Sequence, residues 1–443
     1  MEMFIQRVTD YSFEDIDQTT MESAKKVLID TIGAMIIGVY DSSTERLLDE
    51  VEPMNPGTYQ IIGTKKTVNL NSAAFIHGVA TVAVELDEGN QFSKGHPAAH
   101  IVPAMLTYVQ TKKEYSGRDF VYNLIRSYEV CSRFGRATTL LSDAHAHGTW
   151  GVAGSAASIL FMDDVSVREM LDGLNISASF AMPTMWNAAI EGAFIRNVYV
   201  GQSIESGIKV ASLLKAGYYA PKHNMEYVFS QVIGRDFDLA SFNSSSNSDW
   251  DINRNYFKTH AFCRYVHAPL DAFKMIVKEH DIQPSDIKSV TVTTYTRAST
   301  LDSRECGNTL SAKFSIPYAL SIWLHKKKTD QTVFNENILD ELAIKETAKK
   351  IQVVQSDEFD RDYPSIMPVE ILVTLHSGES LRQRLDNANG APGSQMTRQD
   401  IIDKFKSNTS PFISSPRQDE IIDWITDIEN KDNMDDLLNY LYI

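Results

Sequence analysis

Clusters of polar residues interrupt otherwise apolar sequence, and their side chains are of the kinds that transfer protons. The first cluster spans residues 85–100 and holds three carboxylates and two histidines, namely Glu85, Asp87, Glu88, His96 and His100. It lies between two apolar stretches, and catalytic groups are often held on a loop between helices. A solvated helix-to-helix turn is the alternative interpretation. The spacing matches no familiar metal motif, so we predict no metal here.

A second cluster, residues 143–151, places His145 and His147 just before a stretch of small residues. A histidine at the start of a helix feels the positive end of the helix dipole and tends to stay neutral. A neutral imidazole can act as a general base at physiological pH. The alternative is that these are helix-capping or buried structural histidines.

Three further places carry candidate groups. Arg196 could bind a carboxylate through its forked guanidinium, or could be an ordinary surface arginine. Tyr318 could be a core residue or a proton donor. Residues 258–271 crowd polar side chains near an inferred domain boundary, a favoured location for small-ligand sites, and they include Lys258, His260, Cys263, Arg264, His267 and Asp271.

Composition narrows the classes of function. The formal net charge of −16 opposes nucleic acid and anionic lipid as partners, so an anionic substrate would require basic groups gathered in a pocket. The three cysteines show no paired metal-ligand spacing and fit a reducing compartment. The start lacks the pattern of a signal peptide, and the longest apolar stretches fall short of a membrane span. We therefore expect a cytoplasmic protein without membrane contact.

Several common activities lack their motifs. The chain has no glycine-rich phosphate loop, no H-E-x-x-H and no G-x-S-x-G. These absences weaken ATPase, dehydrogenase, metalloprotease and α/β-hydrolase interpretations.

The elements that must position these groups indicate a mainly α fold, with a large all-helical domain and a smaller α+β domain. The length of 443 residues suggests two domains or more. Helical periodicity dominates residues 1–259, and alternating apolar residues near 290 and 369 predict strands within an α+β domain at 260–402. Residues 403–443 return to helix, and we expect this tail to rejoin the helical domain.

Capping signals and periodicity predict individual helices. Thr19 with Glu22 and Ser166 with Glu169 have the form of a capping box, and Ser415 with Pro416 marks the start of a tail helix. Further helices are predicted at 71–84, 116–136, 312–325 and 335–351. The polar stretch 243–248 predicts an exposed loop.

Taken together in chain order, the clusters resemble the MmgE/PrpD family. Five elements carry the resemblance: the acidic run with His96-Pro97, the His145 to Gly151 element, the basic residue five before a glycine, the Lys258 to Asp271 element, and the Phe314 to Tyr318 element. In the fourth element, His260 and Ala261 replace a Tyr-Pro pair. The family includes 2-methylcitrate dehydratases, cis-aconitate decarboxylases and an iminodisuccinate epimerase.

The resemblance implies a helical domain, a smaller α+β lid, an active site between them, a homodimer and no required cofactor. It also implies proton abstraction from carbon next to a carboxylate of a small anionic polycarboxylate. His145 is then the first choice of base or acid and His96 its counterpart. The other roles are Lys258 holding the developing charge, Arg196 and Arg264 binding carboxylates, Glu85 or Asp87 orienting the histidines, Tyr318 as a proton donor, and Cys263 and His267 lining the substrate pocket.

Departures from the family pattern bear on the reaction. Arg196 stands where dehydratase-like and decarboxylase-like members often have lysine, Cys263 stands where the decarboxylases have histidine, and Glu85 stands where aspartate is common. Arg196 and Cys263 point away from a standard decarboxylase, so we predict a 2-methylcitrate dehydratase-like lyase. An epimerase or isomerase and a cis-aconitate decarboxylase-like enzyme stay as alternatives, as does a catalytically silent polycarboxylate-binding protein.

Overall fold

The computed structural model describes residues 1–243, 250–334 and 337–443. The chain divides into two compact units. Unit 1 comprises Met1–Met185, Ile195–Tyr256 and Thr397–Ile443, and unit 2 comprises Trp186–Phe194 and Phe257–Met396. The tail that was predicted to return to the helical domain is part of unit 1. The sequence prediction had kept Trp186–Phe194 in the helical domain.

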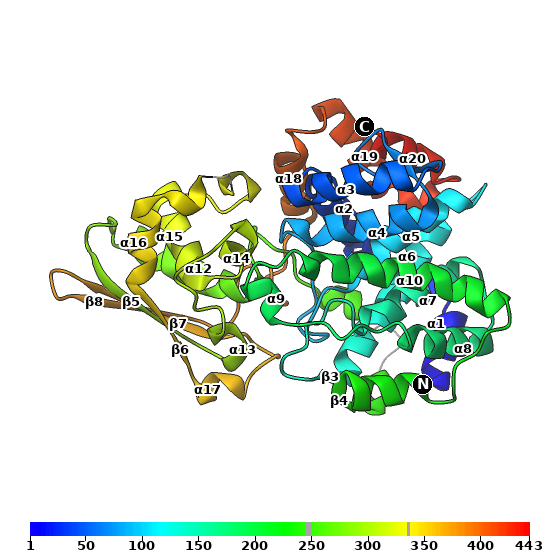
Figure 1. Ribbon diagram of the computed structural model, residues 1–443, viewed down its shortest axis with the longest axis horizontal. Helices are drawn as coiled ribbons and strands as arrows, with labels where there is room; N and C mark the ends of the chain where they lie inside the picture. The colour runs from blue at the N-terminus through cyan, green and yellow to red at the C-terminus, as the bar shows by residue number, and fades with distance from the viewer. Residues whose placement is uncertain (244–249, 335–336) are drawn as a thin grey trace. The chain divides into compact units, whose positions relative to one another are not determined.

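Unit 1 is built almost entirely from helices, with two small two-stranded ladders (Figure 1). Its elements are α1 (Glu2–Asp10), α2 (Gln18–Val39), α3 (Ser42–Met54), β1 (Tyr59–Gln60), β2 (Thr67–Val68), α4 (Leu70–Ala83), α5 (Pro97–Tyr108), α6 (Gly117–Ala137), β3 (Thr138–Leu140), α7 (Gly151–Met162), α8 (Val167–Ala178), α10 (Ile195–Lys215), α11 (Asn224–Tyr227), β4 (Gly234–Phe237), α18 (Arg398–Thr409), α19 (Ser415–Thr426) and α20 (Asp435–Leu441).

The centre of unit 1 is a set of helices that are apolar on nearly every face. All twelve residues of α7 are buried, and α4 and α5 are buried along most of their length. Small residues allow close approach: a Cβ added to Gly78 of α4 would lie 2.7 Å from the Cα of Gly201 in α10. Tight packing of α4 on α10 therefore requires glycine at both positions.

Unit 2 is an α+β unit with one mixed sheet. Its elements are α9 (Asn187–Ile190), α12 (Arg264–Glu279), β5 (Ile287–Thr294), α13 (Thr296–Ser299), α14 (Thr309–Lys313), α15 (Ile316–Lys326), α16 (Leu342–Lys349), β6 (Ile351–Gln355), α17 (Asp357–Asp360), β7 (Val369–Leu375) and β8 (Ser380–Leu385). The strand order is β6-β5-β7-β8, with β5 and β6 parallel and the other two pairs antiparallel. Helices α12 and α15 lie on one face of this sheet (Figure 1).

These observations confirm the predicted fold class and several predicted elements. Ser166 and Glu169 form the predicted capping box, and Ser116 caps α6. The predicted capping box at Thr19 is wrong, because Asp17 accepts from the Thr20 backbone N–H at 2.9 Å and starts α2 at Gln18. The N-cap position of the tail helix is Ser414, one residue before the predicted Ser415, and its side chain makes no capping hydrogen bond.

Two helices predicted in unit 2 differ from the observed ones. The single helix predicted at 312–325 is broken into α14 and α15, because Ser315 caps α15 by accepting from the Tyr318 N–H at 3.0 Å, and Pro317 lies in the first turn. The helix predicted at 335–351 is shorter and covers Leu342–Lys349. Residues 335–336 and most of the predicted 243–248 loop lie outside the described residues.

In the part of the chain that the structure describes, no one helix has both the length and the apolar character needed to cross a bilayer. The bent pair α2 and α3, which meet at 75°, satisfies the length and composition criteria jointly.

Candidate functional site

The groups predicted for the site fall into two sets, one in each unit. Unit 1 holds the first set: Glu85, Asp87, His96, His145 and Arg196. Unit 2 holds the second set: Lys258, Cys263, Arg264, His267 and Tyr318. That the two sets serve one substrate stays a prediction.

In unit 1, the loop from α4 to α5 fixes the orientation of His96. The ring Nδ1 of His96 lies 2.7 Å from the backbone oxygen of Glu88 and 2.8 Å from Oδ2 of Asp87. A carbonyl oxygen only accepts, so Nδ1 carries the proton and the lone pair is left on Nε2. Asp87 is fully buried, while the His96 side chain keeps 13% of its surface exposed. His96 is therefore an imidazole that is fixed at Nδ1, partly exposed, and left with its lone pair on Nε2.

His145 is held in the opposite tautomer. Its Nδ1 accepts a hydrogen bond from the backbone N–H of His147 at 3.0 Å, which places the ring proton of the neutral imidazole on Nε2. Thr184 donates to the His145 carbonyl at 2.7 Å and holds the loop. Neutral His145 is therefore a proton or hydrogen-bond donor through Nε2, whereas neutral His96 is an acceptor through Nε2.

Glu85 and Arg196 form a buried ion pair, with Oε1 of Glu85 2.5 Å from Nη2 of Arg196 and both side chains 1% exposed. Nη1 of Arg196 also donates to the Val82 carbonyl at 3.0 Å and to Oδ1 of Asn197 at 3.1 Å. Of the two carboxylates predicted to orient a histidine, Asp87 contacts His96 and Glu85 contacts Arg196 instead. Two of the three residues named above as departures from the family pattern, Glu85 and Arg196, thus pair with each other.

Glu85 also adopts a left-handed backbone conformation, with φ of 57°, directly after the end of α4. Glycine and asparagine are usual there, and another residue costs of order 1 kcal/mol. The Arg196 ion pair is a specific interaction that keeps a glutamate in this position.

Glu88 lies behind His96 and caps α5. Its Oε2 accepts from the Ala98 N–H at 3.2 Å, and its Oε1 accepts from the Tyr128 hydroxyl. Burial raises the pKa of Glu88 to about 8, against the lowering effect of these hydrogen bonds. The carboxyl group is therefore neutral over much of the physiological range, which limits the negative charge around Asp87.

Two further histidines complete the cluster. His100 donates from Nδ1 to the His96 carbonyl at 3.0 Å. The ring of His147 has its centroid 4.6 Å from that of His145, 5.1 Å from that of His96 and 5.8 Å from that of His100. His147 is fully buried, and within the described residues neither of its ring nitrogens has a hydrogen-bond partner.

Burial lowers the pKa of two histidines in this cluster. Burial lowers the pKa of His147 well below its usual value, with smaller contributions from Arg196 and the neighbouring histidines. Burial also lowers the pKa of His100 to about 4. Desolvation is thus the largest cause of the low pKa of His147, and a contribution from the dipole of α7, which begins at Gly151, stays a prediction. The spacing His-x-His was the sequence signal for His147, which we had not placed among the site residues.

In unit 2, the predicted residues gather around the start of α12. Lys258 and His267 are fully buried, Cys263 precedes the helix, and Arg264 begins it and donates to the Asn389 carbonyl at 3.2 Å. Burial lowers the pKa of His267 well below its usual value. Tyr318 lies buried on α15, and burial raises its pKa.

His260, which was not predicted as a site residue, is held on both sides. Its Nδ1 lies 2.8 Å from Oγ1 of Thr329, and its Nε2 lies 3.0 Å from Oδ1 of Asp271 and 3.3 Å from Nζ of Lys274. The backbone N–H of Asn389 donates to the other oxygen of Asp271 at 3.0 Å. This network lines a small cavity of about 280 Å³.

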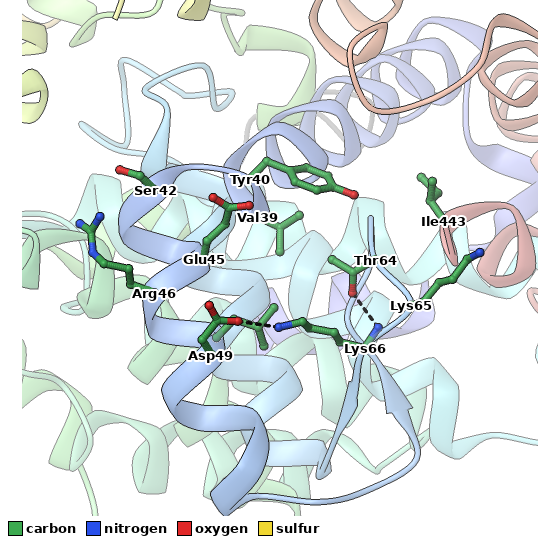
Figure 2. Close-up of a pocket in the computed structure, with 11 residues that line it drawn as sticks. Val39, Tyr40, Ser42, Glu45, Arg46, Asp49, Thr64, Lys65, Lys66 and Ile443 are labelled. Carbon is green, nitrogen blue, oxygen red and sulfur yellow. Dashed lines mark hydrogen bonds and ion pairs between the residues drawn. The ribbon is translucent and has the colours of Figure 1, made fainter. Parts of the chain in front are cut away.

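A larger surface pocket, of about 630 Å³, lies elsewhere in unit 1 (Figure 2). It is formed by the end of α2, the start of α3, the turn between β1 and β2, and Ile443. Lys66 pairs there with Asp49 at 2.7 Å, and its backbone N–H donates to Thr64 at 3.0 Å (Figure 2). The pocket shares no lining residue with the histidine cluster.

Comparison with known proteins matches both parts of the chain to models of one family. Residues 2–240 match the model of the MmgE/PrpD N-terminal domain, and residues 260–430 match that of the C-terminal domain. A cis-aconitate decarboxylase from Aspergillus terreus is 22% identical over 461 residues, covering 97% of this chain and 93% of its own length. The cis-aconitate decarboxylase of Homo sapiens is 21% identical, covering 93% and 88%, and that of Mus musculus is 20% identical, covering 93% and 86%.

Proposed function

The chain belongs to the MmgE/PrpD family, and on this premise we propose that it is a lyase that transfers a proton at carbon next to a carboxylate of a small polycarboxylic acid. The observation that carries the proposal is the pair of opposite tautomers at His96 and His145. One neutral imidazole offers a lone pair and the other offers a proton. Such a pair supplies the base and the acid of a proton-transfer reaction without a change in net charge.

In this proposal, His96 is the base. Its Nε2 takes the proton from carbon, and the imidazolium that forms is stabilised by Asp87, 2.8 Å from Nδ1. The electron pair moves into the adjacent carboxylate to give an enediolate. His145 donates a hydrogen bond through Nε2 to the developing negative charge. In dehydration the C–O bond on the neighbouring carbon then breaks, the C=C bond forms, and the leaving hydroxide takes the Nε2 proton of His145 to become water. Transfer of the proton held by His96 to His145 through solvent restores both neutral imidazoles.

Binding of an anionic acid requires cations, and this chain has a net charge of −16. We assign that role to Lys258 and Arg264, with Cys263, His267 and Tyr318 around the substrate. Arg196 also binds a substrate carboxylate in this proposal, but its guanidinium already pairs with the Glu85 carboxylate. Arg196 therefore offers the substrate less net positive charge than an arginine without that pair would.

Cys263 stands where the decarboxylases have histidine, and this departure places dehydration of a 2-methylcitrate-like hydroxy acid first. Decarboxylation of an acid such as cis-aconitate is the second candidate, because the relatives described above carry that name. Both reactions place negative charge on carbon next to a carboxylate, and we propose that neither needs a metal or a nucleotide.

Proton NMR in heavy water tests the proposal. Citrate-like, aconitate-like and succinate-like acids are incubated with the protein in EDTA. We expect solvent deuterium to enter one C–H position of the true substrate, followed by loss of water or of carbon dioxide, which identifies the reaction. Deuterium exchange without net loss would instead indicate an epimerase. Saturable binding of an acid without exchange would overturn the lyase and favour a silent binding protein.

A His145→Ala variant tests the assignment of the donor. We expect it to fold normally and to lose turnover on the true substrate by about 10²-fold or more, since general acid catalysis contributes at least that much. Full turnover in a folded His145→Ala protein would reject His145 as a catalytic residue.

A further inference from the structure

The proton-transfer reaction leaves two buried histidines of the cluster without a task, His100 and His147. Nδ1 of His100 is held by the His96 carbonyl. His147 is fully buried, and across the described ranges no hydrogen-bond partner reaches either of its ring nitrogens. A buried polar group without a partner costs about 1–3 kcal/mol. Another buried histidine of unit 1, His77, has a hydrogen-bond partner at both ring nitrogens. Its Nε2 accepts from the Ile62 N–H at 2.9 Å, and its Nδ1 lies 2.7 Å from Oγ1 of Thr107. We therefore expect the ring nitrogens of His147 to bind a ligand.

The neighbours of His147 supply the rest of a ligand set. One donor atom from each of Asp87, His96 and His147 lies within 4.8 Å of the others. Nδ1 of His96 donates to the Glu88 carbonyl, so the Nε2 lone pair is the one presented to a ligand. Histidines that bind metals are usually held in this way, by a hydrogen bond from the second ring nitrogen to a carbonyl or carboxylate oxygen.

We propose that Asp87, His96 and His147 form a binding site for a divalent transition-metal ion, with Zn²⁺ as its representative. Two imidazoles and one carboxylate suit Zn²⁺, whereas Mg²⁺ and Ca²⁺ prefer oxygen ligands throughout. Bonds of about 2.0–2.2 Å in a tetrahedral site hold donor atoms about 3.4 Å apart. Oδ2 of Asp87 lies 2.8 Å from Nδ1 of His96, the nitrogen that does not bind the ion. The Asp87 carboxylate must therefore turn toward Nε2 and the three side chains must draw together on binding, and the fourth position stays open.

The effect of the ion on catalysis rests on the proposed function. The ion takes the Nε2 lone pair of His96, which the reaction needs for proton abstraction. Ion and substrate therefore exclude each other, and Zn²⁺ acts as a reversible inhibitor that EDTA removes.

Equilibrium dialysis of the full chain against Zn²⁺, buffered by a competing chelator, tests the site without substrate. We expect one tightly bound ion per chain. His147→Asn keeps a neutral polar side chain but removes a ligand, and should weaken binding about 100-fold or more, since even outer-shell changes cost 10–100-fold. His223→Asn is the matched control, because His223 is exposed and pairs with Glu226 on the surface, and its affinity should equal that of the unmodified protein.

Absence of saturable binding, or equal affinity in His147→Asn and the unmodified protein, would overturn the site. If His147→Asn does not fold, Co²⁺ binding to the unmodified protein decides. Intense visible absorption from four-coordinate cobalt supports the site, and weak absorption from six-coordinate cobalt contradicts it. Deuterium exchange in EDTA is scored separately, so the ion site and the proposed reaction can fail independently.

Discussion

The histidine cluster of unit 1 and the His260 network of unit 2 differ in how completely their ring nitrogens are hydrogen-bonded. In unit 2, His260 has a partner at both ring nitrogens, and its carboxylate partner Asp271 is in turn held by a backbone N–H. In unit 1, His96 and His145 have their Nδ1 atoms fixed by the backbone, and the chemistry is left to Nε2.

The difference shows how the same residue type is used for structure and for reaction. Burial would raise the pKa of Asp271, but its hydrogen bond to His260 holds the pKa below the usual value, so the pair forms a stable polar anchor. A fully satisfied network of this kind rigidifies its surroundings. The unit 1 cluster is instead half-satisfied, at a cost to stability, and a reacting molecule or an ion can complete it.

The largest expected effect is at His96. His96→Gln removes the basic nitrogen, and we expect deuterium exchange into the substrate to fall about 10³-fold, within the 10²–10⁴-fold range of general base catalysis. Exchange is measured by NMR under single-turnover conditions, with circular dichroism as the folding control. An exchange rate within tenfold of the unmodified protein would place the base elsewhere.

Asp87 should have the next largest effect. Asp87→Asn keeps the size of the side chain but removes the charge that stabilises the His96 imidazolium. We expect kcat to fall about 10²-fold with KM nearly unchanged, because the interaction strengthens only in the transition state. A rise in KM at constant kcat would instead make Asp87 a substrate-positioning residue.

Substitution of His260 should reduce stability and leave turnover nearly unchanged, unlike the substitutions at His96 and Asp87. His260→Leu leaves Asp271 and Thr329 without their partner, and we expect the free energy of unfolding to fall by about 1–3 kcal/mol while kcat changes less than tenfold. Chemical denaturation and steady-state kinetics measure the two quantities. A loss of turnover without a loss of stability would move His260 into the reaction and remove the contrast between the units.

The sequence predicted elements whose signals are local. Alternation at Val290 and at Val369 gave β5 and β7, and Ser166 with Glu169 gave the start of α8. The break between α14 and α15 was also readable, because Ser315 and Pro317 are a helix-start signal within the predicted helix.

The candidate site was predictable only as a set of residue types. The Glu85–Arg196 ion pair joins positions far apart in the chain, and no local pattern specifies it. The tautomers of His96 and His145 depend on single backbone atoms, Glu88 O and His147 N, whose placement follows from the packed loops. Trp186–Phe194 joined unit 2 for a similar reason: the Asn308 side chain donates to the Gly192 carbonyl at 2.8 Å, a tertiary contact without a sequence signature.

The smallest expected effect is on the pH dependence of the free energy of unfolding, and it concerns His77, a buried histidine whose two ring nitrogens both have partners. Burial lowers the pKa of His77 to about 3, so folding requires its neutral form. Its contribution to stability is fully present above the unfolded pKa of about 6.5 and is lost as pH falls toward 3. Between pH 7.5 and 5.5 this loss is about 1.4 kcal/mol, since one pKa unit corresponds to that energy.

Denaturation of the unmodified protein and of His77→Gln at both pH values isolates this contribution, because all other groups titrate in both proteins. We expect the stability difference between them to shrink by about 1.4 kcal/mol at the lower pH. His223→Gln, at an exposed site, should keep the pH response of the unmodified protein. Parallel pH dependence in His77→Gln and the unmodified protein would show that His77 accepts a proton without unfolding. His77 could then no longer serve as the fully hydrogen-bonded histidine with which His147 is compared.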